Sequence, residues 1–427
     1  YLVVLGTPLS INAQDLIGGV GIFLPTEPLL IGVLLLFLLE TIRRNPIDKK
    51  VLKHPISIAI LLNLFWLGVS SYASEMPLVS YKFLTARLWF VVCMFYITSQ
   101  IFKRFQSIKT FVWLYIISLL VVVAYTITIH AQNGFSEEVA HWCMTPFFND
   151  HTSYGALLAF YFPIAIGLFI AGKNSPIVKG LLAFVIFVLA VALILSYTRA
   201  AWLSLIGALG VALILYFKIN FKIVLSGVAT LLVLLFVYAD LITSSLAKNR
   251  QDSSDNLTEH VESVSNISTD ASNLERLNRW SSAWKMFLDK PFFGFGPGTY
   301  QFQYAPYQTA SDKTIISTNT GDGGNAHSEY LGPLAEAGLF GALSFLAIAI
   351  TIIYKGVTLY SSIDKKHKEI RMLVMCHLLG IITYLIHGVL NNFLDTDKAS
   401  VPFWSFAAAL VAIELYHLPK QDEPKLN

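Results

Sequence analysis

The chain contains few charged residues. Of its 427 residues only 13% are charged and 55% are hydrophobic, and its mean hydropathy is +0.61. Soluble domains typically contain about 45–50% apolar and about 25% charged residues, so these values exclude an ordinary soluble domain. The net charge of +3 is also too small to indicate nucleic-acid binding. We therefore expect an integral membrane protein without a nucleic-acid partner.

Cysteine is equally scarce, with three in the chain. Cys93 and Cys376 fall within apolar runs, where cysteine behaves as a small hydrophobic residue, and Cys143 lies in a polar loop. We therefore expect no disulfide and no thiolate metal site. His141 and His151 share the loop of Cys143, but their spacing matches no zinc pattern, so no metal is assigned.

A basic region before the first apolar run is also missing. The chain begins at Tyr1 within an apolar run, whereas signal peptides carry a basic segment ahead of their apolar part. This start predicts a trimmed first membrane helix, with N-terminal residues missing, instead of a signal peptide.

Long apolar runs, by contrast, fill most of the chain. A membrane-spanning helix needs about 20 mostly apolar residues, and such runs predict an all-α polytopic membrane protein with about twelve spans. Asp150, directly before the sixth run, is predicted to cap it. The runs divide the chain into N-terminal helices (1–239), a large polar segment (240–328) and C-terminal helices with a tail (329–427). The predicted spans are residues 1–22, 28–42, 55–72, 83–101, 111–130, 153–171, 178–196, 200–217, 223–239, 329–354, 372–390 and 399–416.

Positive charge alternates between the loops that join these runs. Lysine and arginine gather near residues 43–53, 103–109, 173–179, 218–222, 355–371 and 420–425. Because positively charged loops stay on the cytoplasmic side, both termini are predicted to be cytoplasmic. The opposite, outer face then holds the loop 131–152, the turn at Arg199, the segment 240–327 and the loop 391–398. That face has no supply of ATP or nucleotide sugars, so transfer chemistry there requires a donor that is already activated and carried through the membrane.

The polar segment is predicted to contain a surface helix. Its first part, 251–268, is rich in serine, asparagine and acidic residues and is typical of a mobile loop. Ser272 and Glu275 match a capping box, which predicts a helix from residue 272 to about 289 that Pro291 ends. Apolar residues at three- and four-residue spacing form one stripe, which predicts a position along the membrane surface or against other helices. The stripe consists of Leu277, Trp280, Trp284, Phe287 and Leu288.

Basic side chains on the outer face are candidates for binding an anion. Arg199 lies where two apolar runs meet. It can simply extend to the membrane interface, but positive charge is disfavoured in short outer loops, which favours an anionic ligand. On the predicted surface helix, Arg276 lies at the edge of the apolar stripe and Arg279 well outside it, so Arg276 is better placed to point into a site. The glycine-rich stretch 291–298 lacks the lysine of a P-loop and is predicted to be a turn.

His327 is the candidate proton acceptor. It lies where the polar segment re-enters the membrane, flanked by Asn325 and Glu329. A histidine here can be a hydrogen-bonded cap, but an unperturbed pKa of about 6.5 also lets it accept a proton near neutrality. Asp395 and Asp397, in the last outer loop, can form a solvated turn or support the site.

Together these stretches resemble the O-antigen ligase and polymerase superfamily of bacterial envelope enzymes. Their order, the layout of about twelve helices and the one large outer loop between the ninth and tenth helices agree with that superfamily, so the resemblance covers most of the chain. Ser328 stands where the family's histidine motif often has asparagine. The matching stretches are 198–202 (Thr-Arg-Ala-Ala-Trp), 274–280 (Leu-Glu-Arg-Leu-Asn-Arg-Trp), 289–298, 325–331 (Asn-Ala-His-Ser-Glu-Tyr-Leu) and 335–339 (Ala-Glu-Ala-Gly-Leu).

The resemblance implies a membrane glycosyltransferase of the GT-C type in the bacterial inner membrane, with its active site and large loop in the periplasm. Such an enzyme moves a glycan from undecaprenyl diphosphate to an acceptor hydroxyl without a metal or other cofactor. The family's essential arginines correspond to Arg199 and Arg276, with Arg279 a weaker candidate, and its histidine to His327. The arginines would neutralise the departing diphosphate, and the histidine would take the acceptor's proton. Inversion at the anomeric carbon is expected.

The acceptor is left open by the sequence. Lipid A-core would make the protein a ligase, a second carrier-linked glycan would make it an O-antigen or exopolysaccharide polymerase, and a protein would make it an O-oligosaccharyltransferase. A small-anion transporter and a structural membrane protein are hypotheses from other classes. Transporters tend to show repeated halves and helices broken at the midplane, whereas no convincing repeat is visible here and the candidate charges lie at one surface.

Overall fold

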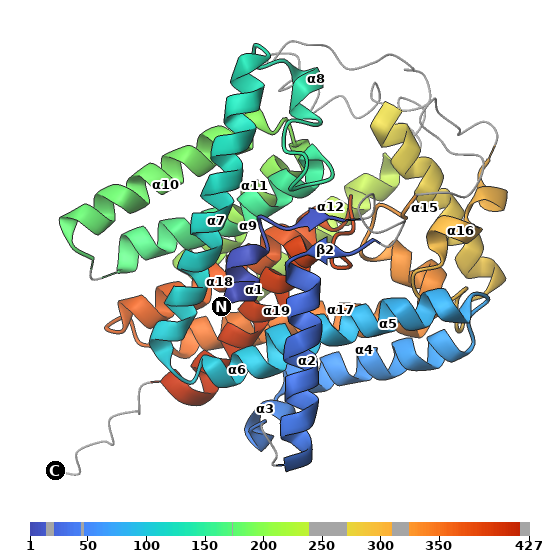
Figure 1. The fold of residues 1–427 in the computed structure, drawn as a ribbon, viewed down its shortest axis with the longest axis horizontal. Helices are drawn as coiled ribbons and strands as arrows, with labels where there is room; N and C mark the ends of the chain where they lie inside the picture. The colour runs from blue at the N-terminus through green and yellow to red at the C-terminus, as the bar shows by residue number, and fades with distance from the viewer. Residues whose placement is uncertain (14–20, 44–46, 173, 239–270, 310–323, 419–427) are drawn as a thin grey trace.

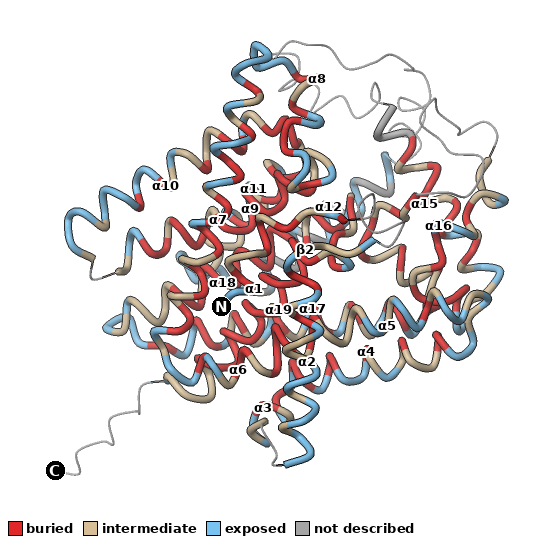
Figure 2. The backbone as a smooth tube through the Cα atoms, in the orientation of Figure 1, coloured by how far each residue is buried: buried red, intermediate tan, exposed pale blue. Residues whose placement is uncertain are grey.

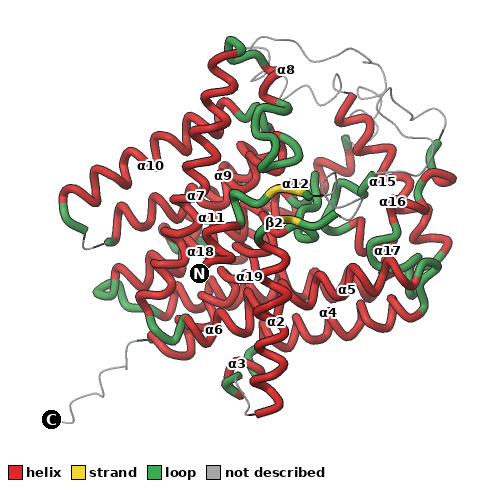
Figure 3. The backbone as a smooth tube through the Cα atoms, viewed as in Figure 1, coloured by secondary structure: helices red, strands yellow, loops and turns green. Residues whose placement is uncertain are grey.

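The protein is built almost wholly from helices (Figures 1 and 3). Within the described ranges, one two-stranded antiparallel sheet pairs β1 (Ile11–Asn12) with β2 (Phe23–Leu24). The predicted helical class is therefore correct apart from this short hairpin. The computed structural model describes residues 1–13, 21–43, 47–172, 174–238, 271–309 and 324–418.

The helices follow the chain in an order close to that of the predicted apolar runs. In the first half they are α1 (Leu2–Gly6), α2 (Thr26–Arg43), α3 (Lys49–Leu52), α4 (Pro55–Tyr72), α5 (Pro77–Val91), the π-helical η1 (Val92–Ile97), α6 (Thr98–Ile101), α7 (Phe105–Gln132), α8 (Glu137–Ala140), α9 (His151–Ala171) and α10 (Pro176–Leu195). In the second half they are α11 (Arg199–Phe217), α12 (Phe221–Val237), α15 (Ala271–Asp289), α16 (Tyr300–Gln303), η2 (Ala305–Tyr307), α17 (Leu331–Ser362), α18 (Lys368–His387), α19 (Asp397–Ala412) and η4 (Ile413–His417).

In the part of the chain that the structure describes, nine helices are long and apolar enough to cross a membrane. They confirm a polytopic helical membrane protein, while the count of twelve remains a prediction. Each of the other three predicted spans differs for a physical reason. The described part of the first contains only α1 and the strand β1. The second, α2, carries Glu27, Glu40 and Arg43, and α12 has 17 residues, at the lower end of the range of about 17–25 for a membrane-spanning helix.

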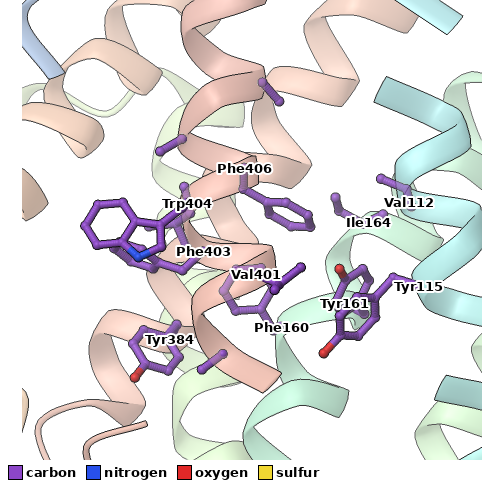
Figure 4. Packing of buried hydrophobic residues seen from close by; sticks show 14 of the residues in the cluster. Val112, Tyr115, Phe160, Tyr161, Ile164, Tyr384, Val401, Phe403, Trp404 and Phe406 are labelled. Atoms are coloured by element: carbon purple, nitrogen blue, oxygen red, sulfur yellow. The ribbon is translucent and has the colours of Figure 1, made fainter. Parts of the chain in front are cut away.

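The core of the molecule is built around α19. Every residue of this helix is buried, and Figure 2 shows it in red at the centre of the fold. Its aromatic side chains pack on those of α9, with 4.7 Å between the ring centroids of Phe160 and Phe406. On the other side of α9, Tyr161 stacks on Tyr115 of α7 at 4.2 Å (Figure 4). In contrast, α10 and α11 leave many apolar side chains exposed, as expected for helices that face lipid.

The stretch 291–298 docks the polar segment onto α17. Phe295 and Gly296 donate backbone hydrogen bonds to the carbonyls of Ala335 and Glu336, at 3.1 and 2.7 Å. Gly294 has a φ of +66°, and a Cβ there would lie 2.3 Å from the carbonyl carbon of Glu336. α17 itself kinks at Gly338, whose φ is +67°. The stretch is therefore a structural turn, as predicted, and its glycines permit a close backbone approach.

The surface helix predicted from residue 272 is present as α15, Ala271–Asp289. Its buried face is formed by Glu275, Asn278, Arg279, Ser282, Ala283 and Met286, whereas Trp284 and Leu288 are exposed. Leu277, Trp280 and Phe287 of the apolar stripe are half-buried. The stripe is therefore partly covered by the rest of the protein and partly exposed, and both predicted positions, along the membrane surface or against other helices, stay predictions. Of the predicted capping box only Glu275 belongs to the described side chains, and the predicted loop 251–268 also lies outside the described residues.

Two charged residues at the start of α19 hold the N-terminal segment. The Lys398 ammonium donates to the backbone carbonyls of Thr7 and Ser10, the latter at 2.7 Å. The hydroxyl of Ser10 also donates to the Asp397 carboxylate. Both charged side chains are buried, so Asp397 is a structural residue of the core, and the prediction that it supports the site directly finds no contact here.

Candidate functional site

Arg199 is placed by a tight contact between α9 and α11. Thr198, which precedes α11, donates its hydroxyl to the backbone carbonyl of His151 at 2.8 Å. The contact is close because residue 155 is glycine: a Cβ there would lie 2.6 Å from the Thr198 side chain. Tyr197 adopts a left-handed φ of +49°, so the chain turns sharply between α10 and α11. Arg199 therefore begins α11 beside the N-terminus of α9.

Arg276 reaches the same region from the surface helix. Its guanidinium donates Nε to the carbonyl of Leu390 at 3.2 Å. Burial and the nearby positive charge of Arg199 lower its pKa to about 10, while Asp150 acts in the opposite direction. The side chain therefore stays positively charged at neutral pH. Two arginine charges that repel one another at a partly buried position favour an anionic ligand between them.

His327 has a backbone conformation unusual for its residue type. Its φ is +47°, and its N–H donates to the Asn325 side-chain oxygen at 3.0 Å. The indole N–H of Trp280 donates to the His327 carbonyl at 3.3 Å. Non-glycine residues in the left-handed region are uncommon and concentrate at functional sites. Asn325 therefore supports the turn that aims the imidazole.

The charges around His327 determine its protonation. Burial, followed by the positive charges of Arg276 and Arg279, lowers the pKa of the imidazole to about 4, and Asp150 and Glu275 act in the opposite direction. The imidazole is therefore neutral at pH 7, the form that can accept a proton. An anion bound at the arginines would reduce their effect and raise this pKa.

Arg279 lies on the buried face of α15 and supports the His327 segment. It forms a buried ion pair with Glu275, with Nε and Oε1 2.7 Å apart, and donates Nη1 to the carbonyl of Asn325 at 3.1 Å. Its guanidinium also lies 5.1 Å from the ring centroid of Tyr304. These contacts assign its donors to protein groups, so Arg279 is better placed to position the segment than to bind a diphosphate.

The structure thus brings Arg199, Arg276 and His327 to one region, although they come from separate parts of the chain. Two neighbours complete this arginine–histidine cluster. Asp150 caps α9 as predicted, accepting the Ser153 N–H at 2.7 Å, and its charge also acts on Arg276 and His327. His151, whose charge interacts with both arginines, was not singled out as a site residue. The sequence feature that could have identified His151 is its position directly after Asp150, the predicted cap of the sixth apolar run.

Glu329 organises the last outer loop. Its carboxylate accepts the backbone N–H groups of Phe393 and Leu394 at 2.8 and 2.9 Å, together with the hydroxyl of Tyr384. Its own N–H donates to the carbonyl of Gly388 at 2.8 Å. The predicted supporting role of Glu329 is therefore to hold the loop that also carries Asp395.

A cavity of about 920 Å³ lies next to the His327 segment. We call it the outer cavity, because its walls include residues of the segment 324–329 and residues 392 and 395, which belong to the face predicted to be the outer one. Asn325, Ser328 and Glu329 line it, as do Asp395 and Arg87, whereas His327 itself does not. Residues 324–326 and 328–329 thus line the outer cavity, while His327, between them in the sequence, belongs to the arginine–histidine cluster.

Arg87, on α5, was missed by the sequence analysis. It lies within a predicted span, and ionisable residues inside membrane helices are rare and usually functional. That signal was available. The carboxyl groups on which its charge acts, Glu329, Glu336 and Asp395, could not be known, because they come from distant parts of the chain.

A family profile described as O-antigen ligase matches residues 182–346. This stretch, which is less than half of the chain, is similar to that family. The matched O-antigen ligase region contains Arg199, Arg276, Arg279, Asn325 and His327, so the candidate residues fall within the family's own domain. No curated protein matches the chain significantly.

The O-antigen ligase region was predicted to hold no metal. Within the described ranges, no three His, Cys, Asp or Glu side chains lie together in the way a metal site requires. His141 and His151 do stack, with 4.4 Å between their ring centroids. All three cysteines are buried. Metal independence remains a prediction.

Proposed function

We propose that the protein is a GT-C-type glycosyltransferase that moves a glycan from undecaprenyl diphosphate to a hydroxyl of lipid A-core at the periplasmic face of the inner membrane. The family match makes a ligase- or polymerase-type membrane glycosyltransferase the coarse assignment. The observation that carries the finer proposal is the cluster of two partly buried arginines beside a neutral histidine. A transporter does not require this arrangement at one surface.

In the proposed reaction the arginines act on the donor. Arg199 and Arg276 bind the diphosphate oxygens, since guanidinium groups meet phosphate with two parallel donors and a permanent charge. As the bond between the anomeric carbon and the diphosphate oxygen breaks, the leaving undecaprenyl diphosphate retains the electron pair. The two cations stabilise the negative charge that develops there.

His327 acts on the acceptor. Its neutral imidazole removes the proton from the attacking hydroxyl while that oxygen forms the new bond to the anomeric carbon. Attack from the side opposite the diphosphate inverts the anomeric configuration. Asn325 and Arg279 hold the segment that carries His327 through the contacts described above.

A transfer assay with purified protein in lipid nanodiscs tests the proposal. With undecaprenyl-diphosphate-linked glycan and lipid A-core supplied, His327→Ala is expected to lower kcat by about 10²–10⁴-fold, the usual contribution of a general base. Arg199→Ala and Arg276→Ala are each expected to remove about 2–5 kcal/mol of interaction with the diphosphate. Full activity in any of these variants contradicts the assigned role.

A control variant and a comparison of acceptors complete this assay. Arg104→Ala changes an exposed arginine at the start of α7 that caps no helix through its side chain, and it is expected to leave transfer unchanged. Supplying a second carrier-linked glycan, or a protein, in place of lipid A-core separates the ligase from the polymerase and from the O-oligosaccharyltransferase. Transfer only to one of those acceptors would replace the proposed acceptor but retain the donor chemistry.

A further inference from the structure

The outer cavity has walls suited to a sugar. Its carboxylates come from Glu27, Glu329, Glu336 and Asp395, and its amides from Asn325, Asn392 and Gln301. Aromatic rings of Trp89 and Tyr300 also line it. Carboxylates accept hydrogen bonds from hydroxyl groups, and amides both accept and donate them. Aromatic rings offer an apolar face. Its volume of about 920 Å³ lies within the range of about 300–1,000 Å³ usual for small-molecule sites.

The walls of the outer cavity hold more acidic than basic side chains. Four carboxyl groups line it, whereas Lys82 and Arg87 are its only cationic side chains among the described residues. Burial raises the pKa of the Glu329 and Asp395 carboxyls, which favours their neutral form. A neutral carboxyl group both donates hydrogen bonds to hydroxyl groups and accepts them.

Arg87 is the donor group best placed to bind such a ligand. It is half-buried on α5, with its guanidinium 5.4 Å from the ring centroid of Phe83. Its charge acts on Glu329, Glu336 and Asp395, but among the described residues no carboxylate lies within ion-pair distance of it. A guanidinium with five N–H donors beside a cavity can therefore bind hydroxyl oxygens of a ligand.

Asp395 is the acceptor that complements Arg87. The other three carboxyl groups already accept hydrogen bonds from the protein. Glu27 accepts the N–H of Phe23 at 3.1 Å, Glu329 accepts the N–H groups of residues 393 and 394, and Glu336 accepts the N–H of Tyr300 at 3.0 Å. Asp395 lines the same cavity and directly follows the loop that Glu329 holds. Arg87 and Asp395 thus supply a donor and an acceptor to the same cavity.

We propose that the outer cavity binds the saccharide of the acceptor, with Arg87 and Asp395 hydrogen-bonding its hydroxyl groups. This inference rests on the proposed function, since it assigns the second substrate of the same reaction. The geometry agrees with a shared active centre: Asn325 and Ser328 line the cavity on either side of His327 in the sequence.

Separate binding measurements on the full chain in nanodiscs test this inference. The acceptor probe is a delipidated lipopolysaccharide core oligosaccharide followed by saturation-transfer NMR and calorimetry, and the donor probe is undecaprenyl diphosphate. Arg87→Gln and Asp395→Asn are each expected to raise the Kd for the oligosaccharide about tenfold or more, since a hydrogen bond to a charged group is involved. Their Kd for undecaprenyl diphosphate is expected to change less than about twofold.

Further variants serve as controls for these binding measurements. Arg199→Ala is expected to lose undecaprenyl diphosphate and keep the oligosaccharide, and Arg104→Gln is expected to bind both probes normally. Arg87→Lys retains the positive charge and tests whether the fork-shaped donor is required, so a partial recovery of oligosaccharide affinity supports the proposal. Each variant is compared only after its thermal melting matches that of the unchanged protein.

Three results would overturn the inference. The first is loss of undecaprenyl diphosphate, instead of the oligosaccharide, in the Arg87 and Asp395 variants, which would assign the cavity to the donor. The second is no oligosaccharide binding by a protein that transfers glycan to lipid A-core. The third is Arg87-dependent binding of a serine-containing peptide in place of the oligosaccharide. Arg87-dependent oligosaccharide binding by a protein that transfers nothing would instead contradict the proposed function and leave the cavity assignment intact.

Discussion

At the scale of single residues, the sequence predicted the candidate site residues that are charged or polar next to apolar runs. Arg199 lies between two apolar runs and His327 at the end of the polar segment, and the structure brings them to one region with Arg276. Arg87 and His151 were missed because their significance depends on which helices are neighbours. Arg279 shows the reverse case: an arginine in a matching motif whose donors are taken up by Glu275 and the carbonyl of Asn325.

The lowered pKa of His327 predicts a specific pH dependence. The neutral imidazole is the active form, so the rate falls as pH drops below the pKa of that group. In kcat/KM, which reports the free enzyme, the acid limb is expected near pH 4. In kcat the limb is expected at higher pH, because bound diphosphate offsets Arg276 and raises the pKa. Initial rates across pH with both substrates varied give the two limbs.

His327→Gln provides the control for this profile. It retains a polar side chain but does not titrate, so the acid limb assigned to His327 should vanish from its residual activity. A limb of unchanged position in that variant, or a kcat limb below that of kcat/KM, would contradict the assignment.

At the scale of helices, the ends of the surface helix were predicted well, but the side of it that packs on protein was not. The surface helix was predicted over 272–289 and is observed as α15, Ala271–Asp289. Its buried face, however, consists mainly of small and polar residues such as Asn278, which donates to the Gln308 side chain at 2.9 Å. Because lipid is itself apolar, an apolar stripe in a membrane protein does not identify the side that packs on protein. That side is decided by contacts between distant segments, which periodicity does not encode.

The docking of residues 291–298 on α17 gives a prediction at this scale. Gly294→Ala is expected to destabilise the protein by about 2 kcal/mol or more, because its φ of +66° suits glycine and the new Cβ would collide with the backbone of Glu336. The measurement is the apparent melting temperature of the purified protein followed by tryptophan fluorescence.

Gly210→Ala is the matched control for this substitution. Gly210 lies in α11, where an added Cβ meets nothing within 4 Å, and alanine favours helix. Its melting temperature should equal or exceed that of the unchanged protein. Equal melting of both variants would show that the docked turn tolerates a side chain.

At the scale of the whole molecule, hydropathy predicted the helical membrane class, while its count of twelve spans stays a prediction. Nine spans are evident among the described residues, and the three runs that differ are those with charges, few residues or a turn. The central position of α19 was not predicted, although α19 is less apolar than the lipid-facing α10 and α11 and is rich in the small residues that are typical of helix packing in membranes. Its packing against α7, α9 and α18 reveals it.

The predicted orientation in the membrane can be measured with single cysteines. The native cysteines are buried and should not react with an impermeant maleimide. Ser136→Cys, exposed in the loop before α9, is expected to react in intact spheroplasts, whereas Ser361→Cys, exposed near the end of α17, should react only after the membrane is opened. The reverse pattern would place the arginine–histidine cluster on the cytoplasmic side and exclude a periplasmic reaction.

The attachment of Thr7 and Ser10 to Lys398 has a consequence for biosynthesis. The ammonium and the carbonyl of Thr7 are separated by 391 positions in the sequence. During translation the segment that contains Thr7 and Ser10 must therefore remain without its partner until Lys398 has left the ribosome. Insertion cannot reach its final state helix by helix, and a chain interrupted before α19 would keep this segment unanchored and open to quality-control proteases.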